Sequence, residues 1–174
     1  MTRVFAISAL AVLVAGPALA QTATTTHTGP RYDASRTTTI DPAAGTYDRT
    51  AIATRNSDGA TATRQVHGQR TSDGLTISGG TTGFAGRQSS FGYDRTRTAN
   101  GATATGSYTG FGGNNYGYAG SVARNGDGSG YSAQQTVTGP SGATLYNRNV
   151  SASRTSSGIS RTVTTTRAGR FRRR

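Results

Sequence analysis

The chain has 174 residues, with 19 basic residues against 7 acidic ones, a formal net charge of +12 and no cysteine. The absence of cysteine excludes disulfides and thiol nucleophiles, and the chain also contains neither Lys nor Glu, which excludes Schiff-base lysines and glutamate acid–base pairs. Only 32% of the residues are hydrophobic and 25 are glycine, a composition too poor in large apolar side chains for a conventional packed core.

Residues 1–20 have the order of segments found in a secretory signal peptide. A basic start is followed by an apolar run over 4–15, a Gly-Pro pair and the small-residue sequence Ala-Leu-Ala at 18–20. A run of twelve residues is shorter than the roughly 20 needed to span a bilayer. The sequence therefore predicts cleavage after Ala20 and export to the periplasm, the cell surface or the medium.

Residues 21–44 contain two prolines and no sustained period, and they are interpreted as a flexible N-terminal tail. From 45 to 166 glycines recur every 12 to 16 residues, and most of them follow Asn, Asp or Ser. Such pairs favour type I′ hairpin turns, which need positive φ at both central residues. The recurring glycines are Gly45, Gly59, Gly74, Gly86, Gly101, Gly113, Gly128, Gly142 and Gly158.

Between these glycines the side chains alternate with the period of a β-strand. After Gly59, for example, Ala62, Arg64 and Val66 fall on one face and the intervening Thr, Gln and His residues on the other. The pattern predicts an all-β fold: an antiparallel up-and-down meander of about nine short strands over 46–167. Such a sheet has a thin core, tight Gly turns and flexible termini, and is either open or curled toward a barrel. The Gly/Tyr-rich segment 110–121 is also typical of low-complexity sequence, so a largely disordered chain is the alternative.

Few residues could support catalysis or hold a metal. His27 lies in the predicted tail, and His67 lies on the Thr-rich side of a predicted strand. The segment 125–130, NGDGSG, matches the first half of an EF-hand loop, but Thr136 stands where the bidentate Glu belongs. We therefore interpret this segment as a hairpin turn, and we expect no enzyme activity, no metal site and no cofactor.

The C-terminal segment 167–174 concentrates positive charge. Arginine forks bind phosphate and carboxylate groups in bidentate geometry, which predicts lipopolysaccharide, acidic polysaccharide or extracellular DNA as partners; the alternative is a solvated tail that aids solubility. Elsewhere arginine stands beside aspartate, as in YDR at 47–49 and 93–95, so the tail is expected to supply most of the attraction. The predicted polyanion-binding residues are Arg167, Arg170, Arg172, Arg173 and Arg174.

These features together predict an exported, non-enzymatic structural or adhesive protein that presents Thr, Ser and Arg side chains to polar anionic surfaces. Self-association into fibres is compatible with a repetitive β-sequence of this kind. The alternatives are a soluble periplasmic module that binds an anionic ligand and a disordered secreted chain without a defined partner.

Overall fold

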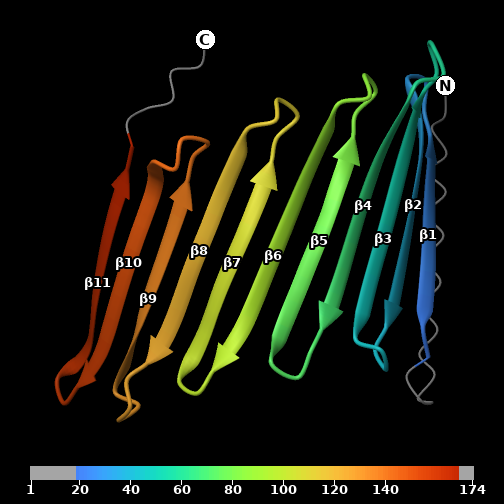
Figure 1. Ribbon diagram of the computed structural model, residues 1–174. Coiled ribbons are helices and arrows are strands. Elements are labelled where there is room, and N and C mark those ends of the chain that lie inside the picture. The colour runs from blue at the N-terminus through green and yellow to red at the C-terminus, as the bar shows by residue number, and fades with distance from the viewer. Residues whose placement is uncertain (1–18, 169–174) are drawn as a thin grey trace, which may run out of the picture.

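The computed structural model describes residues 19–168, so most of the predicted signal peptide lies outside the described residues. Eleven strands form one antiparallel sheet in which spatial order follows chain order (Figure 1). The strands are β1 (Gln21–Thr28), β2 (Tyr32–Asp41), β3 (Thr46–Arg55), β4 (Thr61–Arg70), β5 (Gly74–Thr82), β6 (Gln88–Thr98), β7 (Gly101–Thr109), β8 (Asn115–Arg124), β9 (Gly130–Thr138), β10 (Thr144–Thr155) and β11 (Gly158–Arg167).

The predicted all-β meander is confirmed, with eleven strands where the sequence suggested about nine. The two additional strands are β1 and β2, so the interpretation of residues 21–44 as a tail was wrong. Pro30 and Pro42, which argued against strands, both lie in the loops that flank β2. The segments between them are rich in Thr, a residue that suits the half-exposed surface of a sheet.

Within residues 19–168 the sheet is a single layer, without a second layer of helices or strands on either face. Within residues 19–168 each strand contacts only its neighbours in sequence, and there is no helix that could cross a membrane. The chain has 13350 Å² of accessible surface, whereas a compact monomer of 17.9 kDa would expose about 8,000 Å². Among the described apolar side chains only those of Ala102 and Val150 are buried. Backbone hydrogen bonds and contacts between neighbouring strands must therefore supply most of the stability.

Glycine loops join the strands, but their geometry differs from the predicted one. No non-glycine residue in the described part of the chain has positive φ, which excludes type I′ turns. Three loops share one pattern instead, in which a turn ends on a left-handed glycine; these are residues 83–87, 110–114 and 139–143. A type I turn followed by such a glycine gives a twist that also suits a hairpin. Seven of the nine recurring glycines have positive φ: Gly45, Gly59, Gly86, Gly113, Gly128, Gly142 and Gly158.

A line of apolar and aromatic side chains crosses one face of the sheet. Tyr93 on β6 and Tyr118 on β8 meet over the glycine between them, Gly106 on β7, with ring centroids 6.2 Å apart. The rings thus shield a stretch of backbone that glycine leaves bare. The same cross-strand row contains Ile40, Tyr47, Gly68, Ile77, Tyr93, Gly106, Tyr118, Val137 and Tyr146.

We expect Tyr118→Ala to lower the free energy of unfolding by about 1–2 kcal/mol, because a half-buried ring loses both its apolar contacts and its aromatic partner. Ser121→Ala is the matched control on the opposite face of the same strand, and it should change stability by less than about 0.5 kcal/mol. Urea unfolding followed by circular dichroism measures both variants. Equal midpoints for the two would show that the aromatic row contributes nothing to the sheet.

Candidate functional site

The two faces of the sheet have different chemistry. Side chains that are opposite each other in an antiparallel pair point to the same face, so the register assigns every strand residue to one side. The side that we call the arginine face carries all eight tyrosines of the chain and all arginines that lie in strands. These twelve arginines are Arg36, Arg49, Arg55, Arg64, Arg70, Arg95, Arg97, Arg124, Arg148, Arg154, Arg161 and Arg167.

The opposite side, which we call the threonine face, is neutral or weakly acidic. It presents mainly Thr, Ser, Asn and Gln, and it carries the four aspartates that lie in strands, Asp33, Asp41, Asp48 and Asp94. Rows of side-chain hydrogen bonds cross it: the hydroxyls of Thr22 and Thr39 are 3.0 Å apart and those of Thr24 and Thr37 are 3.2 Å apart.

In the YDR triplets the aspartate lies on the opposite face of the sheet from the tyrosine and the arginine. Tyr47 and Arg49 lie on the arginine face, whereas Asp48 between them points to the other side. There the Asp48 carboxylate accepts a 2.7 Å hydrogen bond from His67 Nδ1. Consecutive residues of a strand point in opposite directions, so aspartate next to arginine in sequence does not neutralise it in space. The YDR triplets therefore give no reason to discount the strand arginines as binding residues.

The charge of the arginine face is almost uncompensated. Among the described residues, Arg55 is the one strand arginine with a carboxylate within ion-pair distance, 3.1 Å from Asp58 in the following turn. The aspartates that lie outside strands, Asp58, Asp73 and Asp127, all occupy turns at the ends of strands. The remaining strand arginines are therefore available to ligands that carry negative charge.

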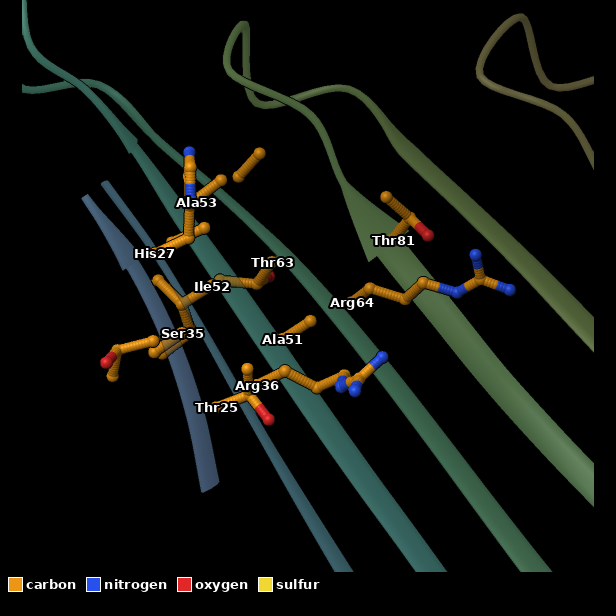
Figure 2. Close-up of a pocket in the computed structure, with 13 residues that line it drawn as sticks. Thr25, His27, Ser35, Arg36, Ala51, Ile52, Ala53, Thr63, Arg64 and Thr81 are labelled. Atoms are coloured by element: carbon orange, nitrogen blue, oxygen red, sulfur yellow. The ribbon is translucent and has the colours of Figure 1, made fainter. Parts of the chain in front are cut away.

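A hollow lies in the arginine face over β1 to β5. Its volume is about 400 Å³, and its floor is formed by small side chains on β2, β3 and β4, including Ala34, Ala53 and Ala62. In the adjacent row Ala51 stands between Arg36 and Arg64, whose side chains extend from β2 and β4 in the same direction (Figure 2). Two strand spacings place the α-carbons of these two arginines about 9.5 Å apart.

The sheet curls around this hollow. Phe84, in the loop after β5, stacks on Tyr32 at the start of β2 with ring centroids 5.7 Å apart, and the Arg55 guanidinium lies 4.9 Å from the centre of the Phe84 ring. In a flat sheet β2 and β5 would be about 14 Å apart. The contact therefore indicates that the arginine face is concave here.

A second hollow, of about 630 Å³, lies near the other edge of the sheet. Arg124 on β8 and Arg154 on β10 line it; Arg124 shares a cross-strand row with Tyr131 and Ala152, and Arg154 lies two residues beyond Ala152 on β10. In both hollows a pair of guanidinium groups stands beside an apolar floor. Such a floor lowers the local dielectric and strengthens bidentate arginine contacts to phosphate, sulfate or carboxylate groups.

The structure describes one of the five arginines predicted from the C-terminal segment. Arg167 ends β11 on the arginine face, and its guanidinium lies 5.9 Å from the centre of the Tyr146 ring. The other four, Arg170, Arg172, Arg173 and Arg174, lie outside the described residues. The sequence interpretation did not propose the eleven other arginines of the face as binding residues, although the alternation had placed Arg64 on the side opposite the Thr residues.

The segment 125–130 forms the turn between β8 and β9, as the sequence predicted. Asp127 Oδ1 accepts hydrogen bonds from the Ser129 hydroxyl at 2.7 Å and from the Ser129 backbone N–H at 2.9 Å. These bonds, with the hydroxyl contributing most, hold the pKa of Asp127 below its usual value. The carboxylate that a calcium ion would need thus serves to close the turn.

Searches against protein-family models, curated proteins and solved structures find no match to this chain.

Proposed function

We propose that the chain is an exported, non-enzymatic structural or adhesive protein that binds polyanionic surfaces through its arginine face. The observation that carries this proposal is the segregation of all twelve strand arginines onto one face, which bears no strand aspartate. A random distribution would place about half of them on each side. The positive charge of the sheet is therefore concentrated on one face.

The shape of the face favours an extended ligand over a small one. Both hollows are shallow depressions in an open sheet, and each has arginines on alternate strands. Further arginines near the end of every second strand, such as Arg70, Arg97, Arg124 and Arg154, repeat the spacing across the sheet. A polymer or surface with many phosphate, sulfate or carboxylate groups can contact several of them at once, and each contact releases counterions.

The tyrosines add a second kind of contact. Tyr108 and Tyr116 lie side by side on the arginine face, with ring centroids 6.1 Å apart, and Tyr108 is 44% exposed. Flat rings on the same face as the arginines can pack against sugar or base rings while the guanidinium groups hold the anionic groups. The threonine face offers only neutral and acidic groups, so it faces away from the ligand in this proposal.

The proposal is tested by binding the purified protein to three anionic probes: vesicles that contain lipopolysaccharide, a polyuronate such as alginate, and duplex DNA. Dextran and neutral phospholipid vesicles are the uncharged controls. Contact with five or six phosphates predicts a log–log salt slope of about −5 for duplex DNA. Binding to the anionic probes that weakens with salt, and none to the controls, supports the proposal. Failure to bind any of the three, or equal binding to dextran, overturns it.

A further inference from the structure

Strand β1 presents an edge that is unprotected within residues 19–168. All eight of its residues are exposed, and its register with β2 runs without interruption from Gln21 to Thr28. Natural sheets protect their edges with charged side chains, proline or bulges, because free backbone N–H and C=O groups otherwise recruit another strand. β1 has the sequence QTATTTHT, which contains no Asp, Glu, Lys, Arg or Pro.

The opposite edge of the sheet differs in this respect. Strand β11 is also fully exposed, but it carries Arg161 and Arg167 on the arginine face. Charged residues on an edge strand disfavour pairing with an identical strand. The two edges, β1 and β11, lie at opposite ends of the sheet (Figure 1).

We propose that β1 pairs antiparallel with β1 of a second copy of the chain, about a two-fold axis perpendicular to the sheet. This operation reverses the strand direction but keeps each face on its own side. Two eleven-stranded sheets then become one continuous sheet, and their arginine faces become one surface. The inference concerns assembly and does not depend on which polyanion is bound.

The side chains of β1 are complementary to themselves in this arrangement. A register centred on Thr25 places Thr24 opposite Thr26 of the second copy and Thr22 opposite Thr28. Thr would then face Thr along the threonine face, as it already does between β1 and β2, where two such pairs are 3.0 and 3.2 Å apart. Thr–Thr pairs of this kind stabilise neighbouring strands.

Electrostatic repulsion does not oppose the pairing. The nearest arginine to the edge in the central row is Arg36 on β2, which is opposite Thr25. Three strand spacings would separate it from Arg36 of the second copy, a distance of about 14 Å. This exceeds the screening length of about 8 Å at physiological ionic strength, so the two positive faces can adjoin at this edge.

The first test is the mass of the purified protein by analytical ultracentrifugation. We expect a dimer for the native chain and a monomer for the double variant Thr24→Lys, Thr26→Lys, because the substitution sets lysines of the two copies opposite each other. The matched variant Thr162→Lys, Thr164→Lys on β11 should remain a dimer. A monomeric native chain, or a dimer that only the β11 variant abolishes, overturns the proposal.

The second test fixes the register and does not depend on the lysine variants. The chain has no cysteine, so Thr25→Cys introduces a single thiol. Opposite residues of an antiparallel pair have α-carbons about 4.5–5.5 Å apart, a separation that a disulfide can bridge. We expect Thr25→Cys to form a covalent dimer under mild oxidation and Val163→Cys, at the centre of β11, to stay reduced. Equal cross-linking of both variants, or of neither, contradicts the pairing.

Discussion

Exchanging four strand arginines with their chain neighbours should weaken polyanion binding at least about 100-fold at 0.1 M salt, although composition and net charge stay the same. The exchanges are R49T with T50R, R64Q with Q65R, R148N with N149R and R161T with T162R. Each moves one positive charge from the arginine face to the threonine face, because neighbouring strand residues point to opposite sides. Four lost phosphate contacts would make the salt slope for duplex DNA shallower by about 3.6.

A matched control keeps the moved charges on the arginine face. Exchanging Arg64 with Val66 and Arg161 with Val163 shifts each arginine by two positions, which preserves its side of the sheet. This variant should bind within about threefold of the native chain, since its face charge is unchanged. Circular dichroism should show the same β-sheet spectrum for the native chain and both variants.

Measuring salt-dependent binding also shows whether the sheet or the C-terminal segment is the main source of attraction to polyanions. If the segment dominates, deletion of 168–174 abolishes salt-dependent binding and the four exchanges leave it intact. If the arginine face dominates, the exchanges remove most of the binding and the deletion removes less. Binding that is unchanged by the four exchanges would contradict the proposed role of the face.

Gly101→Ala should lower the free energy of unfolding by about 3 kcal/mol, the upper end of the range for overpacking. Gly101 is the first residue of β7, and an added Cβ there would overlap the carbonyl oxygen of Val122 on β8. The backbone would have to move, which would weaken the neighbouring 2.8 Å hydrogen bond from the Arg124 N–H to the Asn100 carbonyl. A single-layer sheet has no second layer to compensate for a weakened pair of strands.

Gly126→Ala is the control for this substitution. It lies in a turn, its φ is not in the left-handed region, and an added Cβ meets nothing within 4 Å. Its unfolding midpoint in urea should match that of the native chain within error, whereas the Gly101 variant should unfold at clearly lower urea. Equal midpoints for the two variants would mean that the backbone contact at Gly101 is relaxed at no cost.

The local pattern of the sequence determined the strands and their two kinds of side chain. Period-two alternation and regularly spaced glycines depend only on residues within one hairpin, so they can be recognised without knowing the fold. They correctly grouped Ala62, Arg64 and Val66 on one side of β4. Strands β1 and β2 were missed because Pro30 and Pro42 flank β2 and the regular series of glycines begins only at Gly45.

Only the tertiary structure decided that the arginine-bearing sides of the strands all lie on one face of the sheet. That outcome depends on the register across each loop, and a shift of one residue would move a whole strand's side chains to the other face. The register between β9 and β10 shows that a shift of one residue is enough to change the face. Thr144 pairs with Thr138, but after a bulge Tyr146 pairs with Val137. Without that one-residue shift Tyr146 would lie opposite Thr136, on the threonine face, and Arg148 would follow it. The continuous arginine face, its two hollows and the unprotected edge at β1 are consequences of pairing between strands, which local alternation cannot specify.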